Sequence, residues 1–451
     1  MRSKRQSSSP LEAIHPNAAG IDVGSQTHWV CVPPERSAEN VRSFACFTAD
    51  LYALADWLEQ CGVQTVAMES TGVYWIALFQ ILEVRGFEVK LVNAHHVKTL
   101  PGRKSDVLDC QWLQQLHSYG LLSASFRPDD QICVLRSYIR QRDNLVRSAS
   151  VHIQRMQKAL TEMNVQLHQV ISDITGTTGM SIIRAIVAGE HDPQKLAQLR
   201  DPRTRRSAAD IARALHGDYR QEHLFILRQE LALYDAYQTQ IAACDRQIER
   251  YLSTFERKVK LALPKPGRAP RKPHDNQPGF DLRTHLHRIS GVDFTQIDGL
   301  GVLTVQTILS EVGLDPSRFP TVKQFASWLG LCPGSHITGG KAKHSRTRHV
   351  VNRAANAFRM AAQAVGKTQS ALGAFYRRLR TRLGAPKAIT ATAHKLARLF
   401  YQLWTSGQAY QDLGVSYYEQ RYHEQLVKGL RRKAQALGFD LVAAPSTPIV
   451  S

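Results

Sequence analysis

Two long stretches of the chain, 131–167 and 219–255, repeat apolar residues about every 3.5 positions, the spacing of a coiled coil. Helices of this length need a partner to cover their apolar stripe. The two stretches and the segment between them therefore predict an antiparallel coiled-coil stalk with a helical insert, spanning 131–258. A stalk typically serves assembly, so we expect a homo-oligomer, a dimer or tetramer. The repeating residues are Cys133, Leu135, Ile139, Leu145, Val146, Ile153, Met156, Leu160 and Met163, then Leu224, Leu227, Leu231, Tyr234, Ile241, Ile248 and Leu252.

The region before the stalk, 15–125, alternates between strand and helix patterns. Short apolar runs predict strands at 19–23, 28–32, 41–47, 64–68 and 87–92. Apolar residues at helical spacing predict helices at 51–60, 73–84 and 106–119. Such alternation is typical of an α/β sheet domain.

The region after the stalk begins with a basic, Pro-rich linker, predicted over 259–290. A mainly helical domain follows over 291–410. In it, Phe294–Val312 predicts a helix-hairpin-helix with its turn at Asp298–Gly301. The backbone N–H groups of such a turn can face a phosphate, which makes Gly299 and Gly301 candidate nucleic-acid contacts, although a Gly-rich turn is often only a turn. The tail, 411–451, has no assigned role.

The charge of the chain favours a polyanionic partner. Its 451 residues include 58 Lys and Arg against 38 Asp and Glu, a net charge of +20. From Pro316 to Gln411 there is no acidic residue and there are 16 basic ones. Clustered positive charge favours nucleic acid over two alternatives, an anionic lipid surface or a merely soluble basic protein.

Other bulk features exclude several classes of protein. No apolar run is long enough for a membrane span, and the polar, basic N-terminus is not a secretory signal. The seven cysteines lack paired spacing, which argues against a disulfide framework or a zinc site. We therefore expect free, buried thiols and a cytoplasmic protein.

Four carboxylates in the α/β region form a candidate metal site. Asp22 and Glu69 follow apolar strands, and Asp106 and Asp109 lie three residues apart on one helix face. If they converge at one edge of the sheet, only a cation can relieve their repulsion, and oxygen ligands alone select Mg²⁺ or Mn²⁺. Singly, each carboxylate could instead cap a turn or helix, or form an ion pair.

The acid-free region can use only hydroxyls, His or Lys for chemistry. Its candidate nucleophiles are Ser335, Thr338, Ser345 and Thr347. Gly339 and Gly340 beside Thr338 allow close approach of a phosphate. The alternative is that this segment only binds phosphate and its hydroxyls cap helices. The candidate cations that would contact phosphate or stabilise its charge are Lys341, Lys343, Arg346, Arg348, Arg353, Arg359, Arg377 and Arg378.

These motifs together resemble the DEDD-type transposases of the "one-ten" family of bacterial insertion sequences. The resemblance runs from about 15 to 410 through GIDVG, MESTGVYW, KSDVLDCQWLQQLHSYGLL, IDGLG, WLGLCPGSHITGGK and GAPKAITATAHKLARLFYQLW. It implies an RNase H-like (RuvC-like) N-terminal domain in which Asp22, Glu69, Asp106 and Asp109 hold the metal ions. It also implies a C-terminal nucleophilic hydroxyl, guidance by an RNA that the element encodes, and a location in the bacterial cytoplasm, associated with the nucleoid.

The chain departs from the family at the nucleophile, where Thr338 stands in place of a serine. Either Thr338 acts, or Ser335 or Ser345 does, or this copy is impaired. The prediction is an RNA-guided, Mg²⁺-dependent DNA transposase or recombinase. The alternatives are a metal-only nuclease like the Holliday-junction resolvases and a non-catalytic nucleic-acid binder. An actin-like sugar kinase or ATPase is disfavoured because the sequence lacks a second phosphate loop and an adenosine motif.

Overall fold

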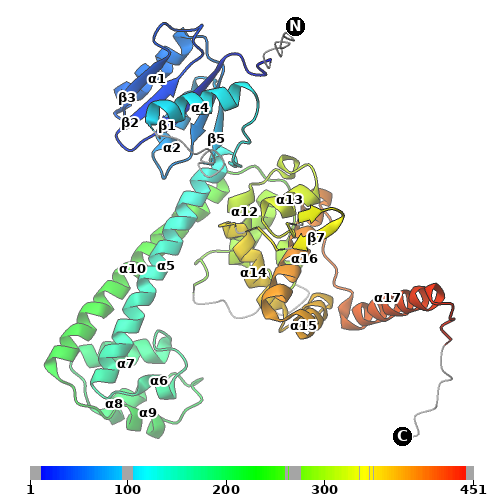
Figure 1. The fold of residues 1–451 in the computed structure, drawn as a ribbon. Coiled ribbons are helices and arrows are strands. Elements are labelled where there is room, and N and C mark those ends of the chain that lie inside the picture. The colour runs from blue at the N-terminus through cyan, green and yellow to red at the C-terminus, as the bar shows by residue number, and fades with distance from the viewer. Residues whose placement is uncertain are drawn as a thin grey trace, which may run out of the picture. The chain divides into compact units, whose positions relative to one another are not determined.

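The computed structural model describes residues 12–93, 105–259, 263, 276–334, 336–344, 346–348 and 350–442. The chain divides into two compact units, 1–127 and 128–451. The first is a mixed α/β unit and the second is mostly helical, which confirms the coarse prediction (Figure 1). No helix in the described ranges is both long and apolar enough to cross a membrane.

A five-stranded mixed sheet forms the first unit, with strand order β3-β2-β1-β4-β5. Its first three strands pair antiparallel, and β4 and β5 continue the sheet parallel to β1. The strands lie close to the predicted ranges, because each is an apolar run closed by turn residues. Their bounds are β1 Ala18–Val23, β2 Thr27–Cys31, β3 Val41–Ala45, β4 Thr65–Glu69 and β5 Glu88–Val92.

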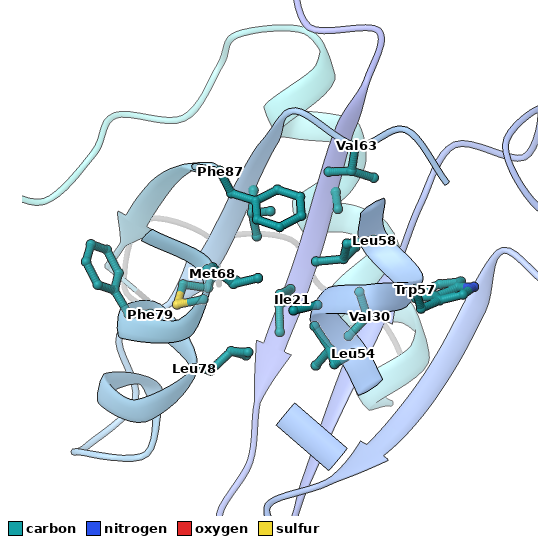
Figure 2. Close-up of a cluster of buried hydrophobic side chains, with 14 of the residues drawn as sticks. Ile21, Val30, Leu54, Trp57, Leu58, Val63, Met68, Leu78, Phe79 and Phe87 are labelled. Atoms are coloured by element: carbon teal, nitrogen blue, oxygen red, sulfur yellow. The ribbon is translucent and has the colours of Figure 1, made fainter. Parts of the chain in front are cut away.

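One face of this sheet carries the hydrophobic core. Helices α1 (Thr48–Gln60) and α2 (Trp75–Val84) contribute Leu54 and Leu78, which are buried with Ile21 of β1 and Met68 of β4 (Figure 2). Successive side chains of a strand point to opposite faces. The residues that follow Ile21 and Met68, Asp22 and Glu69, therefore point to the other face.

Helix α4 (Asp106–Ser118) covers that other face. It lies directly on β1, since a Cβ atom at Gly20 would stand 2.2 Å from the backbone nitrogen of Gln114 and 2.4 Å from the carbonyl oxygen of Cys110. Only glycine permits this contact, so Gly20 sets how closely α4 approaches the strand.

The second unit begins with the two long helices predicted from the apolar spacing. They are α5 (Asp130–Glu162) and α10 (Gln221–Ser253), and they run antiparallel. Tyr138 meets Tyr251 near one end, and His152 meets Glu230 towards the other. Coiled-coil geometry stays a prediction. The insert between them packs on its own core with α6 (Leu167–Val170), α7 (Thr177–Val187), α8 (Pro193–Gln198) and α9 (Ala208–Ala214).

A buried ion pair fixes the register of the two long helices. Arg142 of α5 donates to both carboxylate oxygens of Asp245 on α10, and the two side chains are only 4% and 11% exposed. The Asp245 carboxylate also accepts from the backbone N–H of Gly279 at 3.2 Å.

We expect Asp245→Ala to lower the free energy of unfolding by about 3–5 kcal/mol, because it leaves the Arg142 charge buried without its partner. Urea unfolding followed by circular dichroism measures this change. Adding Arg142→Leu should recover much of the loss, since an apolar pair replaces the uncompensated charge. Arg155→Ala, which alters an exposed pair with Glu230, is the control and should cost under about 1 kcal/mol. Equal losses for the two single variants would contradict the assignment.

The remaining helices pack around an aromatic core. Phe294 stacks on Phe400 at 4.0 Å, and Phe358 meets Phe400 edge-on at 5.6 Å. The elements are α11 Leu282–Ser290, η1 Phe294–Gln296, α12 Val302–Val312, η2 Pro316–Arg318, α13 Val322–Trp328, α14 Arg353–Val365, α15 Ala371–Leu383, α16 Ala385–Ser406 and α17 Gly414–Ala436.

The structure differs from the sequence predictions in two places in this unit. A two-stranded hairpin, β6 (His336–Thr338) and β7 (Lys341–His344), interrupts the region predicted as mainly helical. The range predicted as linker, 259–290, ends in helix α11, and residues 260–262 and 264–275 lie outside the described part of the chain. Helix α12 starts at Val302 as expected, while the helix-hairpin-helix assignment stays a prediction.

Candidate functional site

Asp22 and Glu69 lie side by side at one edge of the sheet. Strands β1 and β4 are parallel neighbours, and Ile21 pairs with Met68 in their register. The next residue of each strand is a carboxylate at its C-terminal end, on the face that α4 covers. Asp22 is half-buried and Glu69 is 6% exposed, and the hydroxyl of Thr71 donates to Oε1 of Glu69 at 3.0 Å.

Helix α4 brings the other two carboxylates to the same edge. It runs antiparallel to β1, because the side chain of Gln114 donates to the carbonyl of Ala18 at the start of that strand. The first turn of α4, with Asp106 and Asp109, therefore lies towards the C-terminal ends of β1 and β4. Ser105 is the N-cap of this helix, accepting from Leu108 N–H at 3.4 Å, so Asp106 is not the cap.

These carboxylates share an edge but are not gathered into a closed cluster. Within the described ranges, no group of three or more His, Cys, Asp or Glu side chains is arranged to hold a metal ion. Asp106 is exposed and Asp109 half-buried, so both are accessible from solvent. The donors that the four side chains offer are all carboxylate oxygens, a set that fits Mg²⁺ or Mn²⁺.

The thiol next to Asp109 on α4 does not add a sulfur ligand. Cys110 follows Asp109 on α4 and is fully buried. Burial raises the pKa of its thiol to about 12, and negative charge on Cys31 and Asp22 adds to the effect. Cys110 therefore stays protonated at neutral pH. Because only a thiolate binds a metal, this residue is a core residue and not a ligand.

At the other end of α4, His117 is buried as a neutral imidazole. The hydroxyl of Thr65 donates to the carbonyl of Glu88, so it accepts from Nε2 of His117 at 2.9 Å. Burial, helped by the positive charge of Lys90, lowers the pKa of His117 from 6.5 to about 4.

As the pH falls below 6.5, His117 therefore takes up a proton in the unfolded chain before it does so in the folded one. We expect the stability of this unit to be complete above about pH 6.5 and to fall by roughly 3 kcal/mol as the pH drops to 4. Hydrogen exchange of the β1 and β4 amides from pH 7 to 4 measures the loss. His117→Phe should flatten that dependence. An unchanged pH profile in the variant would show that another group is responsible.

Thr338 is exposed at the end of β6, immediately before the hairpin turn. Gly339 and Gly340 form the turn with φ of +57° and +72°, the signs that a type I′ turn requires at both central positions. Thr338 pairs across the turn with Lys341. Ser335 and Ser345, the alternative nucleophiles, lie outside the described residues, and Thr347 forms a β-bridge with Pro333. The hairpin therefore presents one described hydroxyl at its tip.

The predicted cations divide by what they already contact. Arg348 donates to the carbonyl of Ser327 at 2.7 Å and so ties the hairpin base to α13. Arg377 donates to the carbonyl of Thr368 at 2.7 Å, and Arg378 stacks over Tyr422. Arg346 is exposed near the hairpin base, Arg353 is exposed at the start of α14, and Arg359 is half-buried on that helix. The backbone places Lys341 and Lys343 in β7.

The two glycines of the predicted phosphate-facing turn have different surroundings. A Cβ at Gly299 would lie 2.6 Å from the carbonyl of Ala361 on α14, and its φ is +89°, so packing and backbone conformation account for this residue. Gly301, the N-cap of α12, faces open space. Gly301 is therefore the member of the pair that a ligand can approach.

The hairpin that displays Thr338 was not predicted from the sequence. Its signal was Gly-Gly between two short runs, His336–Thr338 and Lys341–His344, which is a strong hairpin pattern. The contact between Arg378 and the tyrosines of α17 was not predicted either.

Comparison with known proteins matches both units to transposases. Residues 19–165 match a family model described as a DEDD transposase, and residues 293–377 match one described as "Transposase IS116/IS110/IS902 family". A Sinorhizobium fredii protein named "Putative transposase y4pF/y4sB" is 30% identical over 141 residues, covering 28% of this chain and 34% of that protein. A Pseudomonas aeruginosa "Probable family 20 transposase" is 38% identical over 47 residues, covering 10% of this chain and 14% of that protein. These matches span well under two thirds of either relative.

Proposed function

We propose that this chain, which belongs to the IS116/IS110/IS902 family of transposases, cuts and rejoins DNA strands to move an insertion sequence. The observation that supports the proposal is that Asp22, Glu69, Asp106 and Asp109 lie towards the same edge of the sheet, although they form no closed cluster in the described residues. The sheet has three antiparallel strands continued by two parallel ones, and this strand order supports an RNase H-like (RuvC-like) assignment. The high positive charge supports a DNA substrate and a location at the nucleoid.

In this proposal the four carboxylates hold Mg²⁺ or Mn²⁺. If bound there, the ion would supply positive charge that offsets the charge of a phosphodiester and helps to orient it for in-line attack. The residues themselves provide the oxygen ligands, and Thr71 orients Glu69 through its hydrogen bond.

Thr338 is the proposed nucleophile. Its Oγ forms a bond to the scissile phosphorus as the bond from phosphorus to one deoxyribose oxygen breaks, and that oxygen takes up a proton as the threonine hydroxyl loses one. The product is a phosphothreonine ester, which conserves the phosphodiester energy for rejoining. Exposure on an open Gly-Gly turn supports this role, because a DNA backbone can reach the hydroxyl.

A metal-only nuclease of the resolvase type is the second candidate. The β-branched carbon of Thr338 crowds in-line attack, and the acid-free stretch around it offers no carboxylate base. In that case water attacks at the carboxylate edge and the hairpin only binds DNA.

Assembly through the stalk belongs to the same proposal. Phe225 and Leu233 on α10 are 58% and 44% exposed, although the helix already buries another stripe against α5. A second copy of the stalk can cover these residues. A dimer or tetramer could then combine the carboxylates of one protomer with Thr338 of another. We further propose that an element-encoded RNA guides the reaction, in accord with the net charge of +20.

A cleavage assay tests the proposal. The full chain is incubated with Mg²⁺, a supercoiled plasmid carrying the junction of the element, and the RNA transcribed from its flank. Products are run on a denaturing gel with and without protease. A DNA band that migrates slowly without protease and normally after protease treatment supports the covalent mechanism. Free ends without a protein adduct support the metal-only nuclease, and intact plasmid in all conditions contradicts both.

A further inference from the structure

The last helix, α17, lies outside both regions that match transposase models. Every residue of this fully described helix is at least partly exposed. It nevertheless has a defined attachment to α15. The guanidinium of Arg378 lies 3.5 Å from the ring centre of Tyr422 and 5.6 Å from that of Tyr418, and Phe375 meets Tyr418 edge-on at 6.2 Å. These contacts set which side of α17 faces α15.

The side of α17 that faces α15 is an apolar stripe. Tyr418, Tyr422, Leu426 and Leu430 are four residues apart and therefore share one face of the helix. Helix α15 covers only the first half of this stripe, through its contacts with the two tyrosines. Leu426 and Leu430 are 47% and 46% exposed.

The opposite side of α17 is basic. Lys428 stands two residues from both Leu426 and Leu430, and at 3.6 residues per turn this places it about 200° around the helix. Arg421 and Arg432, seven residues before and four after Lys428, share its face, and Arg431 borders it. Arg431 and Arg432 also line a surface hollow with Lys428. The two tyrosines that contact α15 lie about 100° around the helix from this face. The face is therefore not the covered side, and Lys428, Arg431 and Arg432 are all exposed.

Acidic residues do not neutralise this face. The one acidic residue on it is Glu424, which stands four residues before Lys428, lines the same hollow and accepts from the side chain of Gln420 at 3.3 Å. The sequence then contains no Asp or Glu from 425 to 439, while Lys428, Arg431, Arg432 and Lys433 fall within six positions. The outer half of α17 therefore keeps a net positive charge, which is complementary to a row of phosphates.

We propose that this basic face of α17 binds the phosphate backbone of a nucleic acid without reading its sequence. The inference rests on the proposed function, which supplies nucleic acid as the partner, and adds a binding site that neither family match covers. An anionic membrane also attracts basic amphipathic helices. It fits less well here, because α15 already covers half of the apolar stripe that would have to enter the bilayer.

Two lysines of the same helix give a matched test. Lys428 lies on the basic face, and Lys433, three residues after Leu430, lies on the stripe side; both are exposed. Binding of the full chain to a labelled duplex of about 30 base pairs is measured by fluorescence anisotropy at several salt concentrations in EDTA. Lys428→Glu should weaken binding about fivefold and should reduce the slope of log affinity against log salt concentration by roughly one. Lys433→Glu should change affinity by less than about twofold. Lys428→Gln should give a smaller loss in the same direction.

Equal losses for Lys428→Glu and Lys433→Glu would overturn the inference, because only the net charge would matter. Unchanged duplex affinity in Lys428→Glu would also overturn it. So would binding to phosphatidylserine vesicles that depends on Lys428 while duplex affinity does not, which would assign the face to a membrane. The assay contains no Mg²⁺ and measures no cleavage. A loss of affinity in Lys428→Glu with no protein–DNA adduct in the cleavage assay would therefore refute the proposed chemistry and leave this site standing.

Discussion

Asp106→Asn should reduce DNA strand cleavage about a thousandfold while leaving the fold intact. The change removes one negative charge and one anionic metal ligand, and losses of several kcal/mol in transition-state stabilisation are typical of such sites. Asp106 is exposed in the first turn of α4 and Ser105 caps that helix, so the substitution costs little stability. Cleavage rates over a range of Mg²⁺ and Mn²⁺ concentrations measure the effect. Partial recovery at high Mn²⁺ would indicate weakened metal binding.

Asp50→Asn is the matched control for Asp106→Asn. Asp50 is also an acidic residue in the first turn of a helix, but α1 lies on the face of the sheet that carries the hydrophobic core. The cleavage rate of Asp50→Asn should stay within about twofold of the wild type, since it removes a similar helix-terminus charge on the opposite face of the sheet from α4. Full activity in Asp106→Asn, or equal losses in the two variants, would contradict a metal site at the carboxylate edge.

The strands and helices of the first unit could be predicted from the sequence, because its buried residues recur at the spacing typical of strands and helices. Ile21 and Met68 lie in apolar runs that become neighbouring parallel strands, and the carboxylate after each run must then emerge at the same edge. The shared edge thus follows from strand order and the two-residue period. The spacing between the carboxylate oxygens does not, because it depends on side-chain rotamers and on whether a cation is present to offset their repulsion.

The second unit shows where periodicity stops being informative. The long helices were predicted because apolar spacing persists over many turns. The hairpin was not, since His336–Thr338 and Lys341–His344 are too short to show a period, and Gly339 and Gly340 were interpreted only as room for phosphate. The packing of Gly299 against Ala361, 62 positions later, could not be predicted without knowing which helices touch.

Thr338→Ala should abolish the protease-sensitive DNA adduct, whereas Thr338→Ser should preserve it. Alanine removes the oxygen that would attack phosphorus. Serine keeps that oxygen and removes the methyl group that crowds in-line attack, so its adduct should form at least as fast. Thr338 is exposed beside a two-glycine turn, so neither change should affect folding. The measurement is the fraction of cut DNA that stays bound to protein on a denaturing gel.

Comparing Thr338→Ala with Thr338→Ser distinguishes the effect of losing the hydroxyl from the effect of changing the rest of the side chain. Thr347→Ala, in the β-bridge with Pro333 on the same segment, is the control and should keep the adduct. An adduct that survives Thr338→Ala would move the nucleophile to Ser335 or Ser345. Free cut ends in both the wild type and Thr338→Ala would instead mean that water attacks at the carboxylate edge. Because Asp106→Asn should stop cleavage in either case, only the Thr338 variants distinguish a recombinase, which keeps the bond energy in a protein ester, from a nuclease that releases it to water.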